Sequence, residues 1–180
     1  MFFPRLILST PNNTQLPQLV ELDRMCLGGL WTKKGYQREL YSQNSSLLVL
    51  SMEFGSIIGC GCFWSILEEA HITLFMIHPD YQGQGLGQLL LHSLLKEAAN
   101  CELERVTLEV GVYNSSAIAI YQKFGFKLAG RRKGYYQETG EDALILWRRG
   151  LNCPQFQESL SHWWLCISRR LSQYDLQLIE

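Results

Sequence analysis

Three alternating glycines, Gly83, Gly85 and Gly87, constrain the fold of this chain more than any other feature of its sequence. They separate an apolar stretch that ends at Ile77 from a leucine-rich stretch that runs to Asn100. Apolar residues on both faces of the first stretch predict a strand in the interior of a sheet. Helical spacing in the second predicts a helix over 85–100, with one buried stripe formed by Leu86, Leu89, Leu90, Leu94 and Ala98. A strand, a glycine turn and a helix are therefore expected at the centre of an α/β domain.

The glycine turn has the properties of an anion-binding site. The first N–H groups of a helix have no acceptor within it, and the helix dipole adds positive potential at the same end. Glycines also let the backbone approach a phosphate closely. Gln88 stands where a dinucleotide-binding G-x-G-x-x-G motif needs its last glycine, and no P-loop lysine and hydroxyl pair follows. The motif that is left is Gln82-x-x-Gly85-x-Gly87, and a purely structural role for its glycines stays open.

The rest of the chain predicts a mixed α/β fold. Its 180 residues are 47% hydrophobic and 18% charged, which suits a globular domain of ordinary composition. Strands are predicted at 6–8, 47–50, 57–64, 70–77, 106–110, 126–128 and 143–147, and further helices at 16–26, 33–41 and 115–124. An exposed, charged loop is expected between the last two strands.

The composition shifts after Gly150, where Pro154 precedes another predicted helix. We divide the chain into a domain over 1–150 and a helical extension over 151–180 that packs on it. One face of the extension is apolar and carries Phe156, Leu160, Trp163, Ile167, Leu171 and Leu178. Such a face can serve as packing against the domain, as a dimer surface or as a cap on a binding site.

Charge and cysteine usage narrow the partners. The formal net charge of −1 predicts no general attraction to nucleic acid or to an anionic membrane. The six cysteines show no C-x-x-C pair and no zinc-type spacing, and the four histidines show no metal spacing, so no metal and no role for a histidine are predicted. The N-terminal segment lacks the pattern of a signal peptide, no apolar run reaches membrane-spanning length, and free thiols suit a reducing cytoplasm.

A second motif follows in the segment TLEVGVYNSSAIAIYQKFGFK, which starts at Thr107. Taken alone, Glu109 fits a solvated carboxylate at a strand end as well as a proton acceptor. Tyr121 fits a core tyrosine as well as a proton donor, and Asn114 fits the N-cap of a helix. The spacing E-x4-N-x6-Y, followed by Gly125-Phe126 and preceded by the glycine turn, resembles the GNAT superfamily of N-acetyltransferases. Over roughly residues 5–148, the sequence is similar to the RimI-type protein N-terminal acetyltransferases.

This resemblance implies a GNAT fold, a mixed and mostly antiparallel sheet flanked by helices, here with an additional C-terminal helix. It implies acetyl-CoA as co-substrate and direct transfer of the acetyl group to an amine. Glu109 would be the general base, directly or through a water, and Tyr121 the general acid. The coenzyme would be held at Phe75, Met76, Ile77, Gln82, Gly83, Gln84, Gly85, Leu86, Gly87, Gln88 and Asn114, largely through their backbone groups.

The acceptor implied by the resemblance is a protein N-terminus, such as that of a ribosomal protein. The residues in the corresponding groove are Leu30, Trp31, Glu69, Tyr135 and Tyr136. Gly134 interrupts the family's R-R-x-Y-Y pattern before Tyr135, so the peptide contacts differ in detail. Two alternatives stay open, an enzyme that acetylates a lysine or a small amine, and a GNAT module that binds acyl-CoA without catalysis. The extension could also form an oligomer.

Overall fold

The computed structural model describes residues 4–179, so the first three residues of the N-terminal segment lie outside the described residues. One eight-stranded sheet has the order β6-β7-β5-β4-β3-β2-β1-β8. Only β1–β8 and β4–β5 are parallel neighbours, which confirms the mostly antiparallel mixed sheet. The strands are β1 (Arg5–Ser9), β2 (Ser45–Met52), β3 (Ile57–Ile66), β4 (Glu69–Ile77), β5 (Arg105–Gly111), β6 (Lys127–Tyr136), β7 (Glu141–Arg149) and β8 (Gln177–Ile179).

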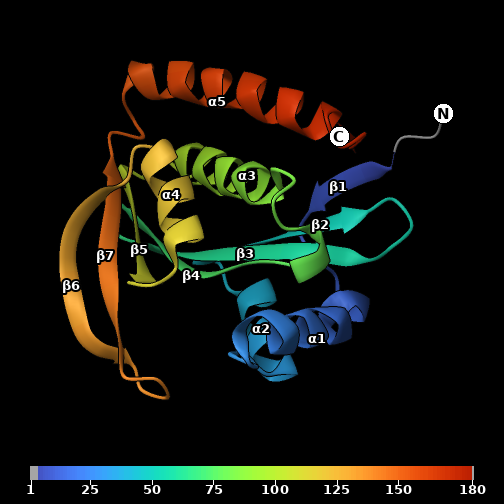
Figure 1. Cartoon of the computed structure of the whole chain (residues 1–180), viewed down its shortest axis with the longest axis horizontal. Coiled ribbons are helices and arrows are strands. Elements are labelled where there is room, and N and C mark those ends of the chain that lie inside the picture. The colour runs from blue at the N-terminus through green and yellow to red at the C-terminus, as the bar shows by residue number, and fades with distance from the viewer. Residues whose placement is uncertain (1–3, 180) are drawn as a thin grey trace.

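Helices cover both faces of the sheet (Figure 1). One face carries α1 and α2, and the other carries α3, α4 and α5, each group enclosing its own apolar cluster. The α-helices are α1 (Leu16–Leu27), α2 (Lys33–Tyr41), α3 (Leu86–Asn100), α4 (Ser115–Lys123) and α5 (Pro154–Ser172), and short 3-10 turns are η1 (Asn13–Gln15) and η2 (Pro79–Tyr81). The three-layer arrangement explains why both faces of the central strands are apolar.

Helix α3 lies against the middle of the sheet because β3 has a glycine beneath it. The predicted stripe of α3 is fully buried, from Leu86 to Ala98. A Cβ atom at Gly61 would lie 2.7 Å from Cδ1 of Leu94, closer than packed carbon atoms approach. The absence of a side chain at this position therefore sets how closely α3 approaches the sheet, and with it the position of the glycine turn.

The charged loop predicted before the last strand is wrong. Residues 127–136 form β6, which pairs with β7 and leaves only a short turn between the two strands. Most side chains of β6 are exposed, so the alternation of apolar and polar residues that marks a half-buried strand is missing. Its pairing with β7 shifts register between Leu128 and Gly130 and again between Arg132 and Tyr136, which carries Tyr135 and Tyr136 to the end of the hairpin.

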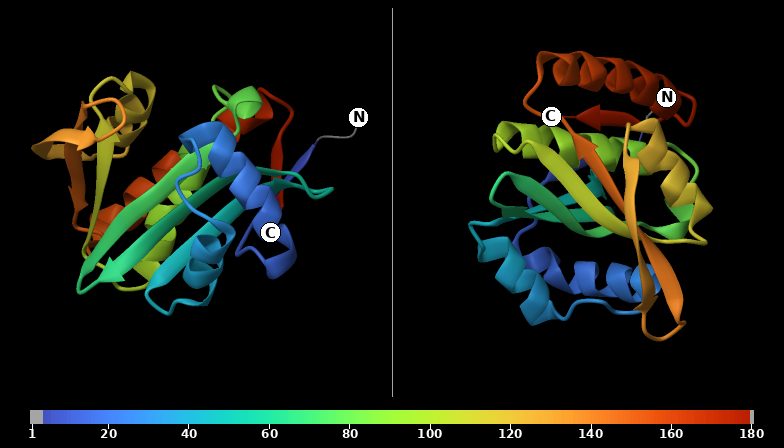
Figure 2. Two further views of the ribbon diagram at one scale, coloured as in Figure 1. Left: turned by 90° about the horizontal axis from the view of Figure 1, so that it is seen from below. Right: turned by 90° about the vertical axis from the view of Figure 1, so that its left-hand side faces the viewer.

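The C-terminal extension contains a helix and a strand. Helix α5 buries Phe156, Leu160, Ile167 and Leu171 in the same cluster as the leucines of α3. The helical position predicted for Leu178 is wrong, because the chain turns after Ser172 and returns as β8, where Leu178 lies beside Leu6 of β1. Figure 2 shows this return along the outer edge of the sheet. The extension therefore completes one edge of the sheet and covers α3.

Candidate active site

The two parallel strands at the centre of the sheet separate along their length. Pairing of β4 with β5 covers only Glu69–Ile72 and Arg105–Leu108. On its other edge, β4 stays paired with β3 as far as Ile77. Within the described chain, Phe75, Met76 and Ile77 therefore lie on a part of β4 that does not pair with β5 (Figure 1). Backbone groups on this edge are available to a ligand, except the carbonyl of Ile77, which accepts from the side chains of Cys26 and Gln82.

The glycine turn continues from this open edge into α3. Gly83 and Gly85 have φ values of 78° and 92°, which side chains with a Cβ atom rarely adopt, and Gly85 is the residue before the helix. Two glutamine side chains brace the turn from within. Nε2 of Gln82 donates to the carbonyl of Ile77 at 3.0 Å, and Nε2 of Gln84 donates to the carbonyl of Asp80 at 3.2 Å. The sequence-predicted turn is therefore held with the N-terminus of α3 open to an anion.

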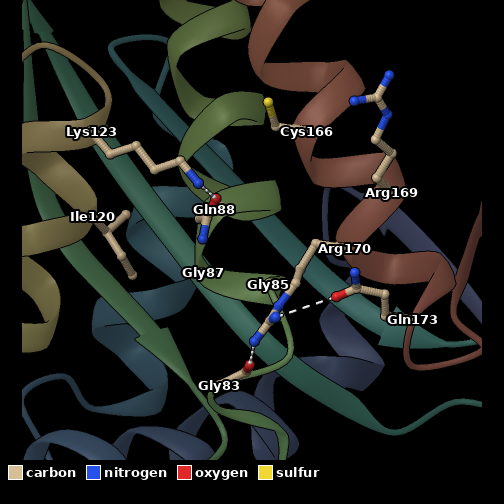
Figure 3. Close-up of a pocket in the computed structure, with 10 residues that line it drawn as sticks. All are labelled: Gly83, Gly85, Gly87, Gln88, Ile120, Lys123, Cys166, Arg169, Arg170 and Gln173. Atoms are coloured by element: carbon tan, nitrogen blue, oxygen red, sulfur yellow. Dashed lines mark hydrogen bonds between the residues drawn. The ribbon is translucent and has the colours of Figure 1, made fainter.

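A cavity of about 390 Å³ lies over this turn (Figure 3). It is lined by the three glycines and Gln88, by Ile120 and Lys123 of α4, and by Cys166, Arg169, Arg170 and Gln173 at the end of α5. Nζ of Lys123 donates to Oε1 of Gln88 at 2.7 Å. The sequence interpretation missed Arg169 and Arg170, since α5 is remote in sequence and nothing in its composition points to the glycine turn.

Glu109 of β5 lies between two cations. Its side chain is 9% exposed, with Oε2 3.2 Å from Nε2 of His71 and Oε1 3.2 Å from Nε of Arg132. The hydrogen bond from His71, together with the charges of His71 and Arg132, lowers the pKa of Glu109 although burial acts in the opposite direction. Glu109 is therefore an ionised carboxylate at neutral pH, held by β4 on one side and by β6 on the other.

His71 belongs to a chain of hydrogen bonds behind Glu109. Nδ1 of His71 lies 2.9 Å from Oγ1 of Thr107, whose hydroxyl donates to Oε1 of Glu69 at 2.6 Å. A threonine hydroxyl has one hydrogen, so Nδ1 of His71 must be the donor, and Nε2 must donate to the carboxylate of Glu109. His71 is therefore an imidazolium, in agreement with its pKa, which the hydrogen bond to Glu109 raises. The sequence interpretation gave this histidine no role, because only the pairing of β4 with β5 brings it to Glu109.

The charge of His71 can be tested by titration. We expect the pKa of His71 to lie above the ordinary value of 6.5 and to fall in Glu109→Gln, because the hydrogen-bonded carboxylate that raises it is lost. Because the pKa of His71 is higher in the folded protein than in the unfolded chain, its charged pairing with Glu109 stabilises the fold. This contribution is complete at a pH below the ordinary pKa of histidine and is lost as the pH rises through the raised pKa. Ring-proton NMR titrations of both proteins measure the shift, and equal midpoints in the two would contradict the pairing.

Tyr121 of α4 lies in an aromatic cluster. Its ring centroid is 5.9 Å from that of Phe75 on β4 and 5.6 Å from that of Phe126. Burial raises the pKa of Tyr121, and the nearby Tyr136 adds to the effect, so the hydroxyl keeps its proton over the physiological range. No hydrogen bond to this hydroxyl is found among residues 4–179. The tyrosine is thus placed beside the open edge of β4 as a neutral donor.

Asn114 acts as the N-cap of α4. Its Oδ1 accepts from the backbone N–H of Ala117 and from the hydroxyl of Ser116, each at 3.2 Å. The capping interpretation of this residue is confirmed. A contact with the coenzyme stays a prediction.

The residues predicted at the acceptor site separate into two groups. Tyr135 and Tyr136 lie at the end of β6 with their rings 5.2 Å apart. Burial is the main cause that raises the pKa of each tyrosine, and the negative charge of Glu109 raises both further. Glu69 instead binds Nε of Arg105 at 2.8 Å and the hydroxyl of Thr107, so its carboxylate is engaged behind the site.

The loop between α1 and α2 is held by a buried carboxylate. Asp23 accepts from the N–H groups of Leu30 and Trp31, both at 2.8 Å, and from the hydroxyl of Tyr36 at 2.9 Å. The α1–α2 pair and the tip of the β6–β7 hairpin extend to the same side of the sheet (Figure 1). Asp23 therefore fixes the backbone of the two residues that the sequence interpretation placed in the acceptor groove.

Known proteins resemble this chain in sequence and in fold. The model of the acetyltransferase (GNAT) family matches residues 16–126. A Bacillus subtilis protein provisionally named as a ribosomal protein bS18-alanine N-acetyltransferase is 33% identical over 132 residues, which are 73% of this chain and 87% of that protein. The Escherichia coli K12 ribosomal protein bS18-alanine N-acetyltransferase is 30% identical, covering 77% of this chain and 94% of its own. A crystal structure of the ribosomal-protein-S18-alanine N-acetyltransferase from Escherichia coli superposes with a TM-score of 0.72 at 28% identity, covering 80% of this chain and 93% of that chain.

The chain therefore belongs to the acetyltransferase (GNAT) family and is an acetyl-CoA-dependent N-acetyltransferase. Helix α5 lies outside the residues that the family model matches. Among residues 4–179, no three or more His, Cys, Asp and Glu side chains are grouped to hold a metal ion. None of the helices in the described part has the length and apolarity needed to cross a membrane.

Proposed function

We propose that this enzyme acetylates the α-amine at the N-terminus of a protein, and that the protein is a ribosomal one. The observation that carries the proposal is Glu109, an ionised carboxylate beside the open edge of β4, with the tyrosines of β6 around it. The names of the Escherichia coli and Bacillus subtilis relatives, at 30% and 33% identity, support the same class of acceptor.

The electrostatics around Glu109 favour an α-amine over a lysine. An amine attacks the acetyl carbon only after losing a proton, and Glu109 accepts that proton directly or through a water. His71 and Arg132 make the surroundings of the carboxylate positive, which disfavours an ammonium group and favours a neutral amine. An α-amine loses its proton about 2.5 pKa units more readily than a lysine, or about 3 kcal/mol. An α-amine is therefore the easier nucleophile for a carboxylate of lowered pKa.

The remaining proposed roles follow from the open edge and the glycine turn. Backbone N–H groups of β4 near Phe75–Ile77 polarise the thioester carbonyl as charge develops on its oxygen. Tyr121 holds a proton beside this edge and donates it to the departing sulfur. N–H groups from Gly83 to Gln88 bind the pyrophosphate of acetyl-CoA, the substrate that supplies the activated acetyl group.

An acceptor screen tests the proposal. The first substrate is a short peptide that begins with alanine and carries one internal lysine, and its matched control is the same peptide with a blocked N-terminus. We expect acetylation of the free α-amine at least about tenfold faster than of the lysine, as the difference in amine pKa requires. Thiol release from acetyl-CoA gives the rate, and mass spectrometry locates the acetyl group.

The two alternatives give different results in the same screen. Equal rates with the free and the blocked peptide would identify a lysine acetyltransferase, and release only with a polyamine such as spermidine would identify a small-amine enzyme. Binding of acetyl-CoA without release in the presence of any acceptor would identify a non-catalytic module.

A further inference from the structure

The end of helix α5 lies directly on the glycine turn. Nη2 of Arg170 donates to the carbonyl of Gly83 at 2.9 Å, and the hydroxyl of Tyr174 donates to the same carbonyl at 3.3 Å. The aliphatic part of Arg170 covers Gly85, where a Cβ atom would lie 2.8 Å from Cγ of the arginine. Figure 3 shows the Arg170 side chain reaching across the cavity to the turn, whereas Arg169 points away from it. Residues 87 positions apart in the sequence are thus in direct contact.

Arg170 forms no ion pair with a carboxylate in the described part of the chain. Its other polar contacts are Oε1 of Gln173 at 3.3 Å and the hydroxyl of Tyr174 at 3.2 Å, both neutral. A neutral carbonyl is a weaker partner for a guanidinium group than an anionic oxygen is. The guanidinium group is therefore placed at the anion-binding end of α3 with no anionic partner from residues 4–179.

We propose that Arg170 is a coenzyme-binding residue, which donates hydrogen bonds to the pyrophosphate bound at the N-terminus of α3. The inference rests on the proposed function, because it assigns the cavity to the coenzyme. The carbonyl of Gly83 accepts from both Arg170 and Tyr174. When the coenzyme binds, Arg170 can therefore turn to a phosphate oxygen while the hydrogen bond from Tyr174 to the carbonyl is kept. A guanidinium fork binds two phosphate oxygens at once, and the backbone N–H groups of the turn bind the others.

This proposal gives the C-terminal extension a role in the donor site. The family model ends at residue 126, before α5, so Arg170 is an addition to the backbone cradle that the matched residues contain. Helix α5 is rigidly attached, because its apolar face is buried against α3. The backbone of Arg170 is therefore held beside the turn before a ligand arrives, and only the side chain has to turn from the carbonyl of Gly83 to the phosphate.

The experiment measures binding to the full-length protein by calorimetry, with coenzyme A, dephospho-coenzyme A and pantetheine as ligands. We expect Arg170→Gln to weaken coenzyme A and dephospho-coenzyme A equally, by about 10- to 100-fold, as loss of a charge-assisted hydrogen bond predicts. Pantetheine has no phosphate, and its affinity, measured by competition, should stay the same. The control is Arg149→Gln, since Arg149 is exposed on β7 and stacks on Trp147 at 3.9 Å.

Each other outcome would contradict either the contact of Arg170 with the pyrophosphate or the proposed function. Weakening of coenzyme A alone would assign Arg170 to the ribose phosphate and overturn the pyrophosphate contact. Equal weakening of pantetheine would show that the substitution disturbs the turn itself, and unchanged binding of all three would exclude a coenzyme contact. If the unsubstituted protein binds no coenzyme A, the proposed function fails rather than the role of Arg170. Arg170→Lys, which keeps the charge, should recover part of the affinity if the contact is with a phosphate.

Discussion

Replacing Glu109 with glutamine is expected to lower turnover by about 100- to 10,000-fold, the range that removal of a general base produces. Glutamine keeps the shape of the side chain but cannot accept a proton. The carboxylate lies 3.2 Å from both His71 and Arg132, so the amide also leaves two cations without their anion. Initial rates with saturating peptide and acetyl-CoA measure the effect.

Coenzyme binding separates this effect from a loss of folding. We expect the affinity of Glu109→Gln for coenzyme A to stay within about twofold of the unsubstituted protein, because Glu109 contacts His71 and Arg132 and does not line the cavity over the glycine turn. Glu104→Gln is the matched control, since Glu104 is an exposed glutamate just before β5. Full turnover in Glu109→Gln would rule out this carboxylate as the base, and the proton of the amine would then have to pass to a water held by other groups.

Tyr121→Phe is expected to reduce turnover by about 100-fold, because the departing sulfur loses its proton donor. The packing of the ring against Phe75 and Phe126 is kept, and no hydrogen bond from residues 4–179 to the hydroxyl is broken. The substitution should therefore leave the midpoint of thermal unfolding nearly unchanged. Single-turnover rates with a fixed amount of acetyl-CoA measure the chemical step itself.

An acetyl donor with a better leaving group provides a second measurement for Tyr121. A thiol of lower pKa needs less help from a proton donor, so the deficit of Tyr121→Phe should shrink with such a donor. An equal deficit with both donors would mean that Tyr121 positions the substrate and does not protonate the sulfur.

The proposed site is assembled from several layers of the fold. The open edge of β4 and the glycine turn provide the donor side, and Glu109 with the tyrosines of β6 provides the acceptor side. Asp23 fixes the loop that carries Trp31, and the hydrogen bonds of its side chain to the described residues go to Leu30, Trp31 and Tyr36. The donor side and the acceptor side of the proposed site are therefore held by different contacts.

Local patterns were sufficient for much of the fold. The stripe from Leu86 to Ala98, the glycines of the turn and the N-cap at Asn114 each depend on residues close together in sequence, and the structure contains all three. The part of β6 that follows Leu128 was predicted as a loop, because no local pattern marks it as a strand. Its side chains are exposed, and its strand conformation depends on hydrogen bonds with β7, which no local pattern records.

The sequence by itself determined the glycine turn, the order of Glu109, Asn114 and Tyr121, and the class of enzyme to which they belong. Tertiary structure alone decided which groups surround them. His71, Glu109 and Arg132 come from three strands and meet only through the pairing of β4 with β5 and the position of β6. Arg170 reaches Gly83 because α5 packs across α3. The physical reason is that backbone conformation follows from neighbouring residues, whereas a contact between distant residues depends on strand register and on how helices pack on the sheet.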